Sequence, residues 1–163
     1  MKLLLITVVI LAVPLVLVLM VGAMLPAAHT ISRSITVNQP PQAVWSLITS
    51  APTWRPEVRK FEELPAHNGH RMWRETDKGG QTITYEAIES VPHRRLMTRI
   101  ADPSLPFGGT WTYEIAPFGG GSSLTITENG EIYNPAFRFV SRFIVGHAAT
   151  VDAYLKAVKT KLG

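Results

Sequence analysis

The segment that most constrains the fold is the C-terminal third of the chain, where two patterned strands lead into an apolar-striped helix. Residues 110–115 and 123–127 each alternate apolar and polar side chains, and three glycines at 119–121 join them. Such alternation is typical of strands that bury one face. A period near 3.6 then predicts one long amphipathic helix over residues 135–162. Its apolar stripe consists of Phe137, Val140, Ile144, Ala148, Val151, Leu155, Val158 and Leu162.

A sheet with one apolar face and a helix with one apolar stripe are expected to bury those surfaces against each other. Further strands are predicted upstream, joined by short turns as in an antiparallel meander. A short helix is expected to begin at Pro40 and Pro41, since proline is favoured in the first turn. The sequence therefore predicts an α+β fold, a curved antiparallel sheet of about seven strands around a long C-terminal helix. The predicted strands lie at residues 34–37, 58–64, 71–75, 81–91, 95–101, 110–115 and 123–127.

The N-terminus forms a separate segment. Residues 3–25 are almost entirely apolar and carry no charge, and a helix of that length, at about 1.5 Å per residue, could cross a bilayer. We expect a single-pass transmembrane anchor with a tether over residues 1–28 and a folded domain over residues 29–163. Cleavage as a signal peptide is the alternative. Lys2 favours an inside N-terminus and an extracytoplasmic domain.

Composition excludes several classes of site. The chain has no cysteine, so thiolate catalysis and disulfides are ruled out. Its formal net charge of +4 comes from scattered basic residues, and no nucleic-acid partner is expected. His67 and His70 flank a glycine turn without an evident third ligand, so no metal site is predicted. No cofactor is expected either.

Four motifs resemble a known superfamily. They are Pro-Pro-Gln-Ala-Val-Trp at 40–45, Trp-Arg-Pro-Glu-Val at 54–58, Gly-Thr-Trp-Thr-Tyr-Glu-Ile at 109–115 and Thr-Glu-Asn-Gly-Glu-Ile at 127–132. Their order resembles that of the START-like, or SRPBCC (Bet v 1-like), superfamily, and most of all its polyketide cyclase/dehydrase and lipid-transport group. The resemblance implies a helix-grip fold with a deep apolar pocket. Because this superfamily contains transporters, receptors and enzymes, the activity stays open.

Candidate site residues follow from the predicted faces. His147, beside the helix stripe, and Arg99, beside Met97, are weak candidates for catalysis. Glu86 and Glu114 are expected on the outer face of the sheet, opposite the larger apolar residues. The small side chain of Ala148 and the neighbouring Gly146 suggest a void. The predicted ligand-binding residues are Trp111, Tyr113, Ile115, Leu124, Ile126, Val140, Ile144, Ala148 and Val151.

The first functional hypothesis is a membrane-anchored domain that binds a hydrophobic small molecule or lipid in an internal pocket. A polyketide cyclase/dehydrase-like enzyme and a protein-interaction module are the alternatives. Whether the chain is catalytic, what its ligand is and how it oligomerises stay open at this stage.

Overall fold

The fold was analysed in a computed structural model, which describes the backbone of residues 2–163 and the side chains of residue 10 and residues 12–163. The remaining side chains of the predicted anchor lie outside the described residues. Within the described part, seven strands form one antiparallel sheet in the order β1-β7-β6-β5-β4-β3-β2. They are β1 (Ala28–Val37), β2 (Val58–His67), β3 (His70–Asp77), β4 (Thr82–Val91), β5 (Arg95–Ile100), β6 (Phe107–Phe118) and β7 (Gly121–Ile132).

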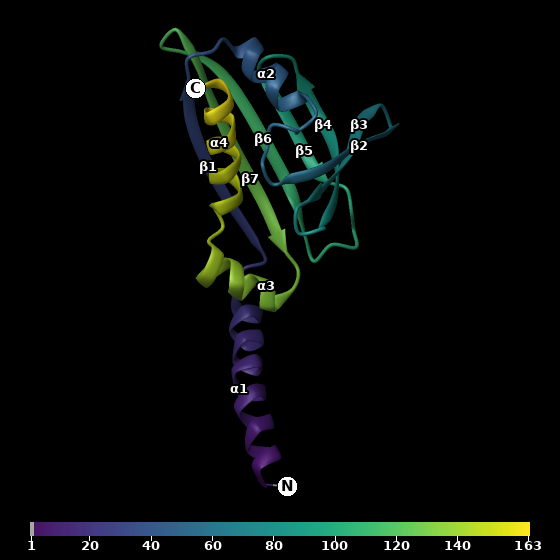
Figure 1. The fold of residues 1–163 in the computed structure, drawn as a ribbon, viewed down its shortest axis with the longest axis vertical. Helices are drawn as coiled ribbons and strands as arrows, with labels where there is room; N and C mark the ends of the chain where they lie inside the picture. The colour runs from purple at the N-terminus through teal and green to yellow at the C-terminus, as the bar shows by residue number, and fades with distance from the viewer. Residues whose placement is uncertain (1) are drawn as a thin grey trace.

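The sheet is a meander from β2 to β7, as predicted, and β1 pairs with β7 at the other edge. Two helices cover its concave face, α2 (Pro41–Thr49) near one end and α4 (Ala149–Leu162) along β1 and β7 (Figure 1). Pro40 caps α2 with an extended backbone, and Pro41 occupies its first turn. Strand β1 begins at Ala28, six residues before the predicted start, because every residue up to Val37 has a partner in β7.

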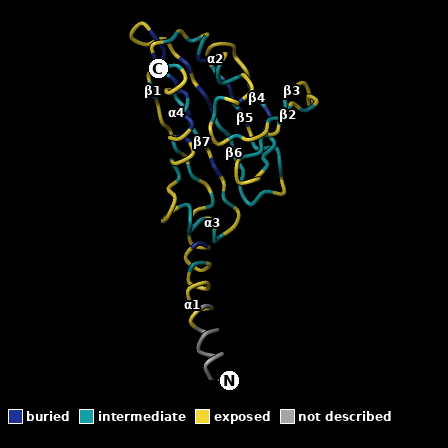
Figure 2. Tube along the Cα trace, viewed as in Figure 1, coloured by how far each residue is buried: buried dark blue, intermediate teal, exposed yellow. Residues whose placement is uncertain are grey.

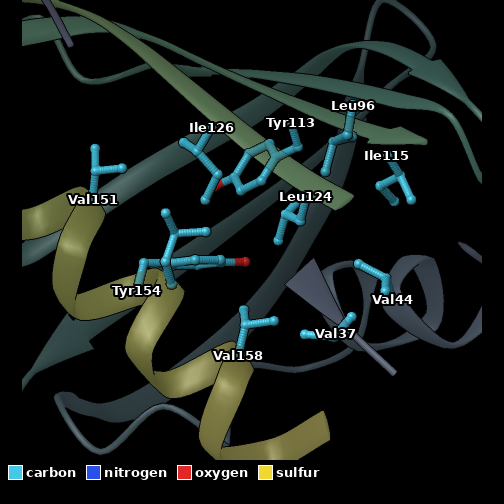
Figure 3. Close-up of a cluster of buried hydrophobic side chains, with 11 residues drawn as sticks. Val37, Val44, Leu96, Tyr113, Ile115, Leu124, Ile126, Val151, Tyr154 and Val158 are labelled. Carbon is cyan, nitrogen blue, oxygen red and sulfur yellow. The ribbon is translucent and has the colours of Figure 1, made fainter. Parts of the chain in front are cut away.

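The core lies between α4 and the concave face of the central strands (Figure 3). The predicted faces of β6 and β7 are confirmed, since Tyr113 and Ile115 are buried and Leu124 and Ile126 have no exposed surface. Trp111, on the same face, is partly buried and packs against this core. Opposite these strands, α4 contributes Val151, Tyr154, Leu155 and Val158.

The predicted single C-terminal helix is wrong, because the segment is broken into three parts. Helix α3 (Pro135–Val140) continues into a π-helical turn, η1 (Ser141–Val145), and Gly146 with φ +83° ends it before α4. L-residues rarely adopt that backbone conformation, so only glycine fits readily there. The break turns α3 and η1 away from the stripe of α4, and Ile144, predicted to face inward, is 71% exposed.

Helix α1 (Lys2–Met24) extends away from the sheet and packs its C-terminal end against α3 (Figure 1). Gly22 permits this contact, since a Cβ built there would overlap the Pro135 carbonyl oxygen. Most described side chains of α1 are exposed (Figure 2). In the portion of the chain searched for membrane spans, no helix is both long and apolar enough to qualify.

Candidate functional site

The main cavity is a groove of about 630 Å³ between α2 and strands β3 to β5. Trp45 and Ile48 of α2 form one wall, and Trp73 of β3 and Leu96 of β5 lie opposite. Ala87 of β4 also lines the groove and has a small apolar side chain. Its remaining lining residues are Thr49, Gly69, His70, Arg71, Ile88, Glu89 and Ser90.

A smaller cavity of about 30 Å³, about the volume of one water molecule, adjoins the groove on its inner side. It shares Ile48, Arg71, Trp73 and Leu96 with the groove, so the two cavities are neighbours separated by these side chains. Six of the twelve residues that line the groove are aromatic or aliphatic, and polar side chains including His70, Arg71 and Glu89 also line it. Polar groups from β3 and from the loop after α2 lie at the inner cavity.

An ion pair between Arg55 and Glu75 is the central polar feature of the inner cavity, and each side chain is only 13% exposed. Trp73 donates its indole N–H to Glu75 Oε1 at 3.0 Å. Burial is the largest single effect and would lower the pKa of Arg55, but the contributions of Glu75, Tyr154, Tyr113 and Glu57 together outweigh it and raise that pKa above its usual value. The guanidinium also lies over the Tyr154 ring, 5.3 Å from its centroid. Arg55 therefore stays charged inside the domain.

Three tyrosines, Tyr85, Tyr113 and Tyr154, lie beside this ion pair. Burial raises the pKa of all three phenols well above the usual value. They are neutral hydroxyls at physiological pH and can donate a hydrogen bond to a ligand oxygen. Tyr113 and Tyr154 pack with ring centroids 5.6 Å apart and both line the inner cavity.

Arg71 connects the groove rim to α2. Its guanidinium donates to both carboxylate oxygens of Glu63, at 2.7 and 2.9 Å, and to the Thr49 carbonyl oxygen at 3.0 Å. The hydrogen bond from Arg71 lowers the pKa of Glu63. Because Thr49 is the last residue of α2, this arginine fixes the end of the helix that forms one groove wall.

The two residues proposed for catalysis lie away from the groove. Arg99 is on the outer face of the sheet, where it donates to Glu86 Oε2 at 2.7 Å and is half exposed. Its side chain does not point toward the core, because the buried positions of β5 are Leu96 and Thr98, which alternate with it. Glu86 faces outward as predicted, beneath the side chains of His70 and Arg99, and hydrogen bonds from these two lower its pKa.

His147 lies just after the Gly146 break and stacks on His29. Its Nδ1 is 2.9 Å from the Ser141 hydroxyl oxygen. On the other side, His29 Nε2 lies 3.5 Å from Glu128 Oε1. Burial raises the pKa of Glu128, and a contact with the Trp111 indole partly opposes that shift. This polar cluster joins β1, β7 and the start of α4 but lines neither cavity described above.

Of the nine residues predicted to bind a ligand, Tyr113 alone lines either of these two cavities. Trp111, Ile115, Leu124, Ile126 and Val151 pack in or against the core between sheet and helix instead. Val140 and Ala148 are partly exposed on either side of the break. The expected void beside Ala148 does not coincide with the groove, and Gly146 faces open space, with nothing within 4 Å of a built Cβ.

The residues that sequence reasoning missed are Arg55, Glu75, Trp73 and Tyr154. Arg71, Trp73 and Glu75 alternate along β3, which places all three on one face. That face was hard to recognise as inward because two of its three residues are charged. Arg55 lies in the 54–58 motif, but its partner is 20 residues away on another element.

Comparison with known proteins is consistent with this architecture. The chain matches the model of one family, described as polyketide cyclase/dehydrase and lipid transport, over residues 28–163. No protein with a curated description matches the chain.

Among solved structures, the similar ones include an aromatase/cyclase from a Streptomyces strain, with 16% identity and a TM-score of 0.67 over 83% of this chain and 93% of that one. A START superfamily protein from Mycobacterium smegmatis shares 17% identity, with a TM-score of 0.65 over 82% of this chain and 97% of that one. The two-domain aromatase/cyclase StfQ of the steffimycin biosynthetic pathway shares 15% identity at a TM-score of 0.65. There the match covers 83% of this chain but 51% of StfQ, about half its length. At such identities the likeness shows a common fold.

Proposed function

The chain belongs to the polyketide cyclase/dehydrase and lipid transport family, and we propose that it binds a hydrophobic small molecule or lipid in the groove between α2 and strands β3 to β5. The observation that carries this proposal is the groove, whose volume of about 630 Å³ is typical of small-molecule sites. Its walls are formed by Trp45, Ile48, Trp73 and Leu96, which suit an apolar ligand.

The polar groups of the inner cavity would recognise one end of that ligand. Arg55 and Glu75 are held against each other with little exposure to solvent, and the hydroxyls of Tyr113 and Tyr154 remain protonated beside them. A carbonyl or hydroxyl oxygen reaching this point would find donors already in place. An apolar molecule with an oxygen at one end therefore fits both the groove and its inner cavity.

A cyclase- or dehydrase-type reaction is the second candidate. It is favoured by the buried phenols of Tyr113 and Tyr154, which could donate a proton to a ligand carbonyl oxygen as general acids. A pure binder should return its ligand unchanged, whereas an enzyme should return a product of different mass or connectivity. Tyr154→Phe would then abolish conversion while binding persists.

We also propose that residues 3–25 anchor the domain to a membrane in a single pass, with the domain on the extracytoplasmic side. The support is the uncharged apolar run in the sequence and Lys2 before it. An anchor would keep the domain near a bilayer, where hydrophobic ligands concentrate.

Photocrosslinking tests ligand binding and locates the site in one experiment. The full chain in membranes is incubated with a photoreactive fatty acid, irradiated, digested and analysed by mass spectrometry. Crosslinks are expected on peptides that line the groove, in residues 69–73 and 87–96. Crosslinks confined to α1 would contradict the proposal, since they would report bulk lipid.

A matched pair of variants adds the control. Ala87 lines the groove, and Ala116 is exposed on β6. Ala87→Phe should reduce groove crosslinks about tenfold, as expected for the loss of about 1.4 kcal/mol of binding. Ala116→Phe should leave them unchanged, and crosslinks on α1 should be equal in both. The melting temperature of each variant confirms that the fold is retained.

A further inference from the structure

Before the break at Gly146, a group of large apolar side chains is more than half exposed, although Phe143 also contacts Phe139 with ring centroids 4.9 Å apart. We call Phe137, Phe143, Ile144 and Val145 the α3–η1 patch. Their exposed fractions are 51%, 59%, 71% and 61%, respectively. Isolated exposed apolar residues are ordinary, but four large ones within nine positions are typical of an interaction surface.

The patch adjoins the C-terminal end of α1. Helix α3 lies across that end in Figure 1, and Arg138 of α3 donates to the Leu25 carbonyl oxygen at 3.4 Å and to the Ile132 carbonyl oxygen at 2.7 Å. These bonds and the close approach of Gly22 to Pro135 hold the two helices together. The exposed apolar residues of α1, including Val13, therefore occupy the same end of the molecule as the patch.

The charge of this region selects among possible partners. Residues 132–151 contain no Asp or Glu but include Arg138 and Arg142. Arg138 is engaged by backbone carbonyl oxygens. Arg142 is exposed beside Phe143 and has no acidic partner among the described residues. Aromatic and aliphatic side chains next to an exposed arginine fit the boundary between acyl chains and anionic headgroups.

We propose that the α3–η1 patch docks on the surface of a lipid bilayer, with Phe143 and Ile144 at the headgroup boundary and Arg142 on anionic headgroups. The inference rests on the proposed anchoring by residues 3–25 and is independent of the ligand in the groove. An α1 helix that crosses the bilayer would place α3 and η1 in the plane of its surface. The domain would then have two attachments, and its orientation on the membrane would be fixed.

Site-specific labels test this on the full chain, which has no cysteine of its own. Three single substitutions, Ile144→Cys, Ala116→Cys and Val13→Cys, are labelled with an environment-sensitive dye. Each protein is reconstituted into vesicles of phosphatidylcholine and phosphatidylglycerol. Quenching by iodide in the buffer reports exposure to water, and quenching by doxyl-labelled lipids reports depth in the bilayer. Ala116 is the exposed control on the sheet, and Val13 reports the insertion of α1.

The label at Ile144→Cys should be quenched by shallow doxyl lipids and be several-fold less accessible to iodide than the label at Ala116→Cys. Equal iodide access at the two positions, with lipid quenching at Val13→Cys, would overturn the docking while the anchor stands. Protection from iodide without lipid quenching would also overturn it, since a protein or a second copy would then cover the patch. Lipid quenching at Ile144→Cys without quenching at Val13→Cys would support docking and contradict the anchor.

A charge reversal tests the role of Arg142. In anionic vesicles, Arg142→Glu should raise iodide access to the label at Ile144→Cys. Arg59→Glu, on the exposed part of β2, is the matched control with the same change in net charge and should have no effect. Equal behaviour of the two variants would overturn the assignment of Arg142 to headgroups.

Discussion

The imidazole rings of His29 and His147 stack with their centroids 4.2 Å apart and so connect the first strand to the start of α4. Burial lowers the pKa of His29. Burial, followed by the positive charges of His29 and Arg142, lowers the pKa of His147. Glu128 faces His29 from β7, but its own pKa is raised. The stacked pair therefore favours two neutral rings.

We expect stability to fall as the pH drops below about 6.5, the ordinary pKa of histidine. In that range the unfolded chain takes up protons that the folded pair resists, so protonation favours unfolding. Above it both states are neutral and the penalty is absent. Melting temperatures between pH 7.5 and 5.5 measure the effect, and the decline should be smaller in His147→Gln. His67→Gln, at the exposed end of β2, is the control and should retain the full decline. Glu128 contributes the opposite slope, but nearer its own titration at lower pH.

Because the helix is broken, two alanine substitutions in the same apolar stripe should change the free energy of unfolding by different amounts. Leu155→Ala should cost about 2–5 kcal/mol, because Leu155 is buried between α4 and the sheet. Ile144→Ala should stay within about 0.5 kcal/mol, because that side chain is largely exposed. Urea unfolding of both variants in one detergent provides the comparison. Equal losses of unfolding free energy would instead favour the continuous helix that the sequence predicted.

Glycine should be required at position 146 because of its positive φ, and not because a side chain would meet a neighbouring atom. Gly146→Ala is expected to cost about 1–3 kcal/mol, because an L-residue there is strained. Since nothing lies within 4 Å of a built Cβ, Gly146→Phe should cost about the same. A much larger loss for phenylalanine, measured by the same unfolding assay, would show that the position is sterically enclosed.

Removing one member of the ion pair in the inner cavity should destabilise the domain far more than removing both. Glu75→Gln should destabilise the domain by about 3–5 kcal/mol, because it leaves the Arg55 charge buried without its counterion. The double variant Arg55→Met with Glu75→Met should be much closer to the parent, since no lone charge remains. Thermal unfolding distinguishes the two cases. A single variant as stable as the parent would indicate that water already screens the pair.

The sequence predicted those elements in which one face alone is buried. Strands β6 and β7 alternate cleanly, so the inward positions of Tyr113 and Leu124 followed directly from their spacing. The order from β2 to β7 was equally accessible because short turns connect neighbours, whereas the pairing of β1 with β7 was not predicted. The prediction that Ile144 faces inward was wrong, because the positive φ of Gly146 breaks the helix although the apolar stripe continues in the sequence.

The candidate site was less predictable because it depends on contacts across the fold. Glu75 becomes an interior residue only through Arg55 and Trp73, and neither partner can be identified from strand alternation. Arg99 shows the reverse problem. It was proposed beside Met97, but Met97 pairs with Thr112 on the face opposite Leu96 and Tyr113, so both Met97 and Arg99 lie on the outer face. Spacing therefore located the core more reliably than the cavity.

Gly146 divides one apolar run between two different surroundings. Residues after Gly146 pack against the sheet and must match its shape. Residues before it are exposed and are not constrained by the core. The two halves can therefore change independently. Substitutions in 137–145 should alter the exposed surface of the domain without disturbing the packing of α4 on the sheet, and substitutions in α4 should alter the core without changing that surface.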